Sequence, residues 1–269
     1  MSYIALNTAA TGMTAMSTSL DVTANNIANA NTTGFKTSRA NFEDLFYQQL
    51  AQPGIPGGNG IQRPTGLYVG LGTQVSGTQL DFAQGPAEAT AKPYDLMIEG
   101  DGFFQVEISQ DVGEGIGYTR AGNFTINEEG QIVLANAPGY RLQPEITIPQ
   151  DASGINISED GIVTGNLPGQ NDPVEFGQID LARFVNPTGL RAVGSNVYIP
   201  TQASGDPLEG QPTTEGIGSI RQGMLEASNT DPVTELVTLI KTQRIFEMNS
   251  QVIQAANETL QNVTNLRAF

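Results

Sequence analysis

The fold is decided by the stretch LNTAATGMTAMSTSLDVTANNI, residues 6–27. Large apolar side chains recur in it every seven residues, and a second series follows three residues later: Leu6, Met13, Leu20 and Ile27, then Ala9, Met16, Thr23 and Ala30. This spacing is typical of a coiled-coil seam, because it keeps one side of an under-wound helix facing a partner. The stretch therefore predicts a long N-terminal helix that cannot bury its apolar stripe alone.

The opposite end of the chain repeats this spacing in LIKTQRIFEMNSQVIQAANETL, residues 239–260. The recurring residues are Leu239, Phe246, Ile253 and Leu260, followed three residues later by Thr242, Asn249, Ala256 and Val263. Asp231 followed by Pro232 is typical of a helix start, because Asp caps free N–H groups and Pro is tolerated at the first helical position. The sequence therefore predicts a second long helix after residue 230.

We expect the two helices to pack against each other and against neighbouring copies of the chain. The first helix carries one charge, Asp21, whereas a solvated helix normally displays several on its free face. A helical hairpin within a monomer would produce the same repeat and is the alternative. The residues predicted to form the seam are Leu6, Met13, Met16, Leu20, Ile27, Leu239, Phe246, Asn249, Ile253, Leu260 and Val263.

Glycine and proline are concentrated in the middle of the chain. All but two of the 31 Gly and all but one of the 15 Pro lie between residues 51 and 225. Turn-forming residues at this density predict many short strands. The predicted fold class is α+β, with a β-rich antiparallel body carried on a coiled-coil pair of N- and C-terminal helices. The expected domains are a helical domain (1–35 and 230–269), an extended arm (36–77) and the body (78–229).

Two β-hairpins are expected in the body. Residues 94–106 are predicted to form two strands joined by the turn Gly100-Asp101-Gly102. Residues 118–134 are predicted to form two strands joined by the turn Glu128-Glu129-Gly130. Glycine at these positions permits the positive φ angles of tight hairpin turns.

Composition argues against catalysis. The chain has no His and no Cys, which excludes imidazole acid–base chemistry, thiol nucleophiles and His- or Cys-based metal sites. The net charge of −16 makes nucleic acid and anionic membranes poor partners. The pattern of a cleaved signal peptide, a basic region followed by an apolar run, is not found in the sequence. No apolar run is long enough to insert into a membrane. We therefore expect neither catalytic residues, metal nor cofactor.

Both ends and the body resemble the axial proteins of the bacterial flagellum, the family of rod and hook subunits. The run Asn-Asn-Ile-Ala-Asn-Ala-Asn-Thr-Thr-Gly-Phe-Lys, residues 25–36, resembles their N-terminal signature, and Gln-Arg-Ile-Phe-Glu-Met-Asn-Ser, residues 243–250, resembles their C-terminal one. The matching signature residues are Asn25, Asn26, Asn29, Gly34, Phe35, Gln243, Arg244, Glu247, Asn249 and Ser250.

This resemblance implies a structural function. The 50–77 arm, with its Gly-Leu-Tyr-Val-Gly-Leu-Gly-Thr pattern at residues 66–73, is similar to the distal-rod members. Such subunits would self-assemble into a rigid helical tube around an export channel and transmit torque from motor to hook. The implied partners are other copies, proximal rod and hook subunits, and the surrounding rings of the outer membrane and peptidoglycan. The implied location is the periplasm-spanning rod, reached through the flagellar type III export apparatus.

Two alternatives stay open. A proximal rod or hook-type subunit would share both signatures. A monomeric secreted polysaccharide-binding β protein would instead need an acid-lined cleft, and the paired acids of this chain occur only as sequence neighbours, as in Glu159-Asp160.

Overall fold

The computed structural model of the chain describes residues 2–54, 65–109, 115–169, 172–214 and 216–267. It divides into two compact units. The helix–ribbon unit comprises Met1–Ala28, Ser38–Gln79 and Asp231–Phe269, and the body comprises Asn29–Thr37 and Leu80–Thr230. The predicted arm thus groups with the helices, and its residues 55–64 lie outside the described part of the chain.

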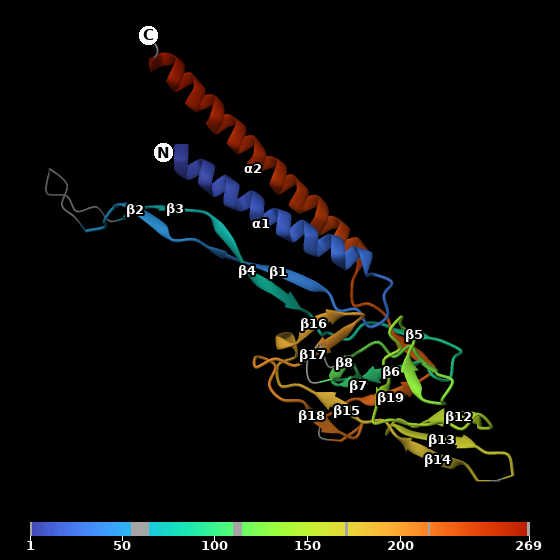
Figure 1. Cartoon of the computed structure of the whole chain (residues 1–269). Helices are drawn as coiled ribbons and strands as arrows, with labels where there is room; N and C mark the ends of the chain where they lie inside the picture. Colours follow the sequence, from blue (N-terminus) through green and yellow to red (C-terminus); the bar gives the residue numbers. More distant parts are fainter. Residues whose placement is uncertain (1, 55–64, 110–114, 170–171, 215, 268–269) are drawn as a thin grey trace. The chain divides into compact units, whose positions relative to one another are not determined.

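Two long helices and a β-ribbon make up the helix–ribbon unit (Figure 1). The helices are α1 (Ser2–Ala28) and α2 (Pro232–Arg267). In the ribbon, β1 (Ser38–Asp44) pairs with β4 (Thr73–Leu80), and β2 (Tyr47–Ala51) pairs antiparallel with β3 (Leu67–Gly70). None of the helices in the described residues is long and apolar enough to cross a membrane.

Asp231 caps α2, as its sequence predicts. Its carboxylate accepts a hydrogen bond from the Val233 N–H at 3.0 Å and another from the Thr234 hydroxyl at 2.6 Å. The Thr234 and backbone hydrogen bonds lower the pKa of Asp231, because they stabilise its charged form. Pro232 follows at the first helical position, where a missing N–H costs nothing.

A seven-stranded antiparallel sheet organises the body. Its strand order is β16-β17-β8-β7-β15-β18, with β11 pairing with β7. The bounds are β7 Phe103–Glu107, β8 Ile116–Thr119, β11 Leu142–Gln143, β15 Leu181–Arg183, β16 Arg191–Gly194, β17 Val197–Ile199 and β18 Leu208–Gly210. A 3-10 turn, Pro187–Gly189, precedes β16.

Smaller antiparallel pairs surround this sheet. They are β5 (Ala87–Ala89) with β20 (Met224–Glu226), β6 (Leu96–Glu99) with β19 (Ser219–Gln222), β9 (Phe124–Ile126) with β10 (Ile132–Leu134), and the three-stranded β12 (Ser153–Ile157), β13 (Ile162–Asn166) and β14 (Val174–Gln178). The α+β class with an antiparallel β body is therefore confirmed.

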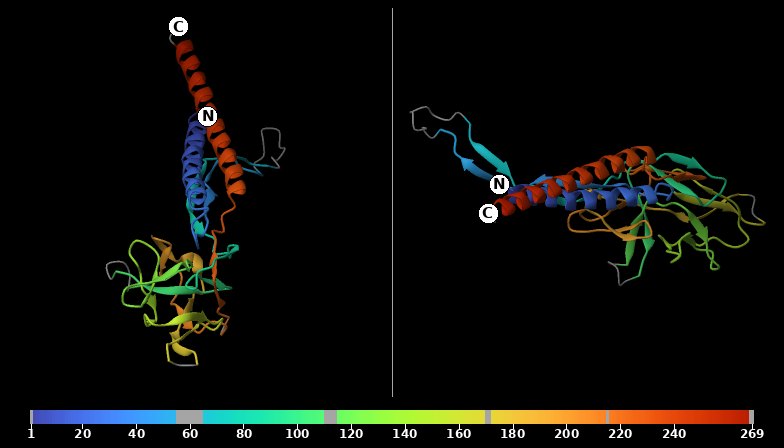
Figure 2. Two further views of the ribbon diagram at one scale, coloured as in Figure 1. Left: turned by 90° about the vertical axis from the view of Figure 1, so that its right-hand side faces the viewer. Right: turned by 90° about the horizontal axis from the view of Figure 1, so that it is seen from above.

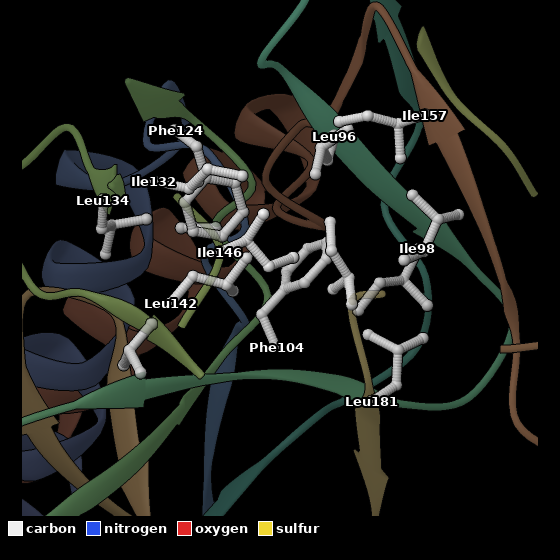
Figure 3. Close-up of a cluster of buried hydrophobic side chains, with 14 of the residues drawn as sticks. Leu96, Ile98, Phe104, Phe124, Ile132, Leu134, Leu142, Ile146, Ile157 and Leu181 are labelled. Atoms are coloured by element: carbon white, nitrogen blue, oxygen red, sulfur yellow. The ribbon is translucent and has the colours of Figure 1, made fainter. Parts of the chain in front are cut away.

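Both faces of β7 are buried. Successive side chains of a strand point to opposite faces, so Phe103 and Phe104 enter different clusters. Phe104 is fully buried and meets Phe124 edge to face, with ring centroids 5.1 Å apart, among the aliphatic side chains of the main core (Figure 3). Phe103 packs among aromatic residues that include Phe184 and Tyr198.

One expected hairpin forms and the other does not. Strands β9 and β10 pair across Gly130, whose φ is +83°, as predicted. The predicted hairpin of residues 94–106 is wrong, because β6 pairs with β19 while β7 pairs with β8 and β15. Gly100 and Gly102, with φ of +104° and +146°, instead carry the chain from one sheet into the next.

Candidate functional site

The two terminal helices lie side by side and antiparallel (Figure 2). A Cβ placed on Gly12 of α1 would lie 3.0 Å from the Asn249 Nδ2 atom of α2. Towards the other end, Asn26 Nδ2 donates to Glu235 Oε1 at 3.2 Å. Because Gly12 has no side chain, the helices can approach closely at the predicted seam position Asn249.

Small and polar side chains form the most buried face of α1. They are Ala9, Gly12, Ala15, Thr23 and Asn26. The larger residues predicted for the seam are half-buried beside this face: Leu6, Met13, Met16, Leu20 and Ile27. Gly12 of this face lies against Asn249 of α2, and the large apolar residues keep part of their surface exposed. Their predicted role between subunits stays a prediction.

The less exposed face of α2 contains the residues predicted from the repeat. Thr242 is buried, and five predicted seam residues are half-buried: Leu239, Phe246, Asn249, Ile253 and Leu260. The side chain of Val263 lies outside the described residues. The helices thus pack together in one chain, while supercoiling of the pair stays a prediction.

Asn26 joins three segments of the helix–ribbon unit. Its Nδ2 donates to the Ser38 carbonyl at 2.8 Å as well as to Glu235, and its Oδ1 accepts from the Ser38 N–H at 3.0 Å. This buried side chain therefore fixes the first strand of the ribbon against both helices. Its neighbour in the signature, Asn25, is exposed.

Gly34 holds the second half of the N-terminal signature inside the body. Its φ is +68°, and its N–H donates to the Glu226 carbonyl at 2.7 Å. A Cβ at this position would lie 2.7 Å from the backbone nitrogen of Ala121. Both the positive φ and the close backbone approach require glycine here.

Hydrogen bonds also tie the signature residues Asn29 and Phe35 into the body. Asn29 Oδ1 accepts from the Thr32 hydroxyl at 3.1 Å, which supports the turn after α1. The Phe35 carbonyl accepts from the Asn229 N–H at 3.3 Å. The hydrogen bond from Asn229 therefore holds the N-terminal signature against the segment that leads into α2.

Three buried charged side chains meet at this junction. Lys36 Nζ lies 2.5 Å from Glu226 Oε1, and Arg120 Nη1 lies 3.4 Å from Glu226 Oε2. Glu226 Oε1 also accepts from the Gly85 N–H at 2.8 Å, and Lys36 Nζ donates to the Ala83 carbonyl at 2.8 Å. We call Lys36, Arg120 and Glu226 the buried ion cluster.

Burial shifts the pKa values of the cluster and its neighbour. Desolvation lowers the pKa of Lys36 and of Arg120, and the attraction of Glu226 opposes both shifts. Desolvation, with a smaller contribution from the nearby Glu226, also raises the pKa of Tyr198 to about 12. Arg120 lies over the Phe103 ring, 5.2 Å from its centroid. The cluster thus holds one anion and two cations out of water. Its stability depends on Glu226, because this carboxylate compensates the charges of both cations.

Sequence reasoning did not predict this cluster. Lys36 ends the N-terminal signature, Arg120 lies in the motif Tyr-Thr-Arg-Ala-Gly-Asn-Phe (118–124) and Glu226 lies in the motif Gln-Gly-Met-Leu-Glu-Ala-Ser-Asn (222–229). The three motifs are far apart in the chain. The available signal was the placement of Lys36 and Glu226 next to Gly34 and Asn229, in motifs otherwise made of neutral residues. Contacts between residues that are far apart in the sequence leave no local pattern from which they could be predicted.

The C-terminal signature lies mostly on the surface of α2. Gln243, Arg244 and Glu247 are exposed, whereas Asn249 and Ser250 are half-buried. No group of acidic residues in the described part of the chain could hold a metal ion. The structure therefore brings Asn249 to α1, half-buries Ser250 and leaves Gln243, Arg244 and Glu247 exposed.

Large apolar side chains are exposed along the helix–ribbon unit. On the ribbon, Phe46 is 89% exposed, and Phe42, Tyr47, Leu50, Leu67 and Tyr68 are also exposed. An apolar cavity of 460 Å³ opens between the ribbon and both helices, lined in part by Ile4, Ala9, Leu50, Val69 and Val252. Contiguous apolar surface of this kind is uncommon on monomeric proteins, so the helix–ribbon unit is the candidate interaction surface of the chain.

Three family profiles match the chain. "Flagella basal body rod protein" matches residues 6–36, "Flagellar hook protein FlgE/F/G D1 domain" matches residues 97–165, and "Flagellar basal body rod FlgEFG protein C-terminal" matches residues 221–266. These matches cover both signatures and part of the body.

Curated relatives match over nearly the whole length. The flagellar basal-body rod protein FlgG of Caulobacter vibrioides is 44% identical, covering 98% of this chain and 99% of the relative. FlgG of Borreliella burgdorferi is 43% identical, covering 98% of both chains. The flagellar basal-body rod protein FlgF of Caulobacter vibrioides is 36% identical, covering 89% of this chain and 87% of the relative.

Proposed function

The chain belongs to the flagellar basal-body rod protein FlgG family, and we propose that it polymerises into the distal part of the rod as a helical tube. A rod protein of this family is a structural subunit of the flagellar basal body. In our proposal the terminal helices form the inner wall around an export channel. The body forms the outer layer, and the ribbon bridges adjacent subunits.

The observation that carries this proposal is the exposed apolar surface of the helix–ribbon unit. Each helix buries only one face. The ribbon is built from two-stranded sheets, and aromatic side chains on it are exposed. Exposed apolar surface of this extent is stabilised when other copies cover it. Contacts between two different surfaces, repeated by a screw operation, build an open filament rather than a closed ring. Many such contacts per subunit would stiffen the tube for torque transmission.

Location and partners are also proposals. We place the subunit in the periplasm-spanning rod and propose that it is exported through the flagellar type III apparatus. The proposed axial partners are proximal rod and hook subunits, and the proposed radial partners are the rings of the peptidoglycan and outer membrane. Support comes from the names of the relatives, which are basal-body rod proteins. Loss of secretion in cells that lack the flagellar export apparatus would test the route.

Electron microscopy of the assembled full-length chain tests the central proposal. The wild-type chain should form tubes, and Leu20→Asp or Phe246→Asp should abolish them, because a charge enters the half-buried helix pair. Circular dichroism should show that the body stays folded in both variants. Leu208→Asp places the same charge on an exposed residue of the body and serves as the matched control. Normal tubes from either helix variant would contradict the proposal.

A different rod position is the second candidate. The FlgF rod protein of Caulobacter vibrioides is also similar over most of the chain. Complementation separates the two: the chain should restore motility to a bacterium that lacks FlgG and should fail in one that lacks FlgF. A chain that stays monomeric and binds polysaccharide would instead support the alternative of a secreted β protein.

A further inference from the structure

The outward side of α2 carries an apolar row that stays largely exposed in the described part of the chain. Its four apolar members are between 46% and 69% exposed. They lie four, three and eight residues apart, which places them on one face of a helix, and Arg244 occupies the position between the last two. We call this set the outer row: Val233, Val237, Ile240, Arg244 and Met248.

The outer row lies away from the face that contacts α1. That face contains Leu239, Thr242 and Phe246, which are half-buried or buried. A helix that shows apolar residues on two sides has two faces to cover, and α1 covers one of them. The second face therefore requires a partner outside the chain.

The outward side of α1 has a shape that fits the outer row of α2. Between residues 10 and 24 its exposed members are small or short and lie three or four residues apart, and we call them the outer face: Ala10, Thr14, Ser17, Asp21 and Ala24. The same side begins with Tyr3, which is 82% exposed. Met13 and Leu20 lie next to this set on the helix and are half-buried. Small side chains flanked by larger ones provide a shallow groove for the ridge of another helix.

A single charge interrupts each surface. Asp21 is the only charged residue in α1, and Arg244 is the only one in the outer row. Within the described residues, neither side chain has an ion-pair or hydrogen-bond partner. Because the outer face and the outer row both point away from the contact between the helices, these two charges do not meet within one chain.

We propose that the outer row of one copy packs on the outer face of α1 of a second copy, with Arg244 paired to Asp21 of that copy. The proposal rests on the proposed function and names the surfaces through which its subunits meet. The ion pair fixes the axial register of an otherwise apolar and small-residue contact. Because the two surfaces differ, every subunit presents both, and the contact propagates without closing.

Cross-linking tests the pairing directly, because the chain contains no Cys. Full-length Asp21→Cys and Arg244→Cys chains are mixed, assembled and treated with a short bis-maleimide. Each chain then holds one thiol, so a cross-link between the two variants joins two copies. The expected result is a covalent dimer from this mixture. Ile245→Cys is the matched control, since Ile245 is exposed on α2 and lies about 100° round the helix from Arg244, outside the outer row. No dimer, or equal dimer from the control mixture, would overturn the proposal.

Charge reversal gives a second test that does not depend on cross-linking. Asp21→Arg and Arg244→Asp each place like charges together, which costs several kcal/mol across an interface. Each should therefore raise the concentration required for assembly by about tenfold or more. The double variant, with the pair reversed, should return to near the wild-type value. Asn257→Asp adds a negative charge with little change in size at an exposed position on another side of α2, and it should assemble as the wild type does.

The outcomes separate this interface from the proposed function. Assembly of the wild type together with unimpaired single variants, or failure of the double variant to recover, would remove the interface and leave the rod function standing. A wild-type chain that forms no assembly would remove the rod function and the interface with it. Circular dichroism of each variant monomer checks that the helices still form.

Discussion

The body and the helix–ribbon unit bury very different side chains. In the body, large residues such as Phe104 and Leu181 are fully buried, and even the charged Glu226 is enclosed. In the helix–ribbon unit, the buried side chains are small or polar, and most of the exposed large apolar residues of the described chain lie there. The body therefore completes its own core, whereas the helix–ribbon unit leaves apolar surface exposed, which in our proposal other copies cover.

The largest difference between the two units is expected when one aromatic ring is removed from each and the stability of the body is measured. Phe104→Ala should lower the free energy of unfolding of the body by about 4 kcal/mol, since it leaves a cavity in a closed core. Phe246→Ala, in the half-buried helix pair, should change the stability of the body by less than about 0.5 kcal/mol. Urea unfolding followed through the body measures both. Equal losses would show that the two units unfold as one.

Neutralising the buried acid should have the next largest effect. Glu226→Gln leaves Lys36 and Arg120 buried without a countercharge and should cost the body about 3 kcal/mol. Glu129→Gln is the matched control, because Glu129 is exposed at 3.9 Å from Arg141 and such a pair contributes little. The same urea measurement compares them. A loss under about 1 kcal/mol for Glu226→Gln would contradict the role given to the buried ion cluster.

Alkaline pH should weaken the body through Tyr198. Its pKa is raised to about 12, above the ordinary value of 10.0. A raised pKa means that the contribution is fully present below pH 10 and is lost as pH rises through 12. Tyr198→Phe lacks this group, so the wild type should lose about 2 kcal/mol relative to the variant between pH 9 and pH 12. Parallel pH profiles for the two chains would contradict the assignment.

Widening the contact between the helices should have the smallest effect. Gly12→Val introduces a branched side chain where even a Cβ is 3.0 Å from Asn249. We expect a local loss of about 1 kcal/mol, seen as faster hydrogen exchange in α1 and α2 with no change in the body. Ala10→Val, on the exposed outer face, is the control in the monomer. Equal exchange in the two variants would place the close contact elsewhere.

The sequence predicts local features of this molecule well. The cap at Asp231, the two terminal helices and the hairpin around Gly130 all arise from residues close together in the chain. The repeat also identified the less exposed face of α2. On α1 it emphasised the large residues, while the buried contact uses small ones such as Gly12 and Ala15.

Features that depend on distant partners could not be predicted. The Gly100–Gly102 turn has hairpin chemistry, but β6 finds its partner in β19, near the far end of the body. The buried ion cluster likewise joins Lys36, Arg120 and Glu226 from three separate motifs. No property of the separate motifs indicates these pairings, because they are decided by the packing of the whole body.

Hydrogen exchange on the purified monomeric full-length chain tests the central claim most directly. It should be read separately for α1, for the ribbon strands, for the body and for α2. We predict weak but measurable protection in α1, α2 and the ribbon, and strong protection in the body, because only the body closes its own core. On assembly, protection should extend to the helices and the ribbon. Helices as well protected as the body in a verified monomer would contradict the claim that neighbouring copies complete the helix–ribbon unit.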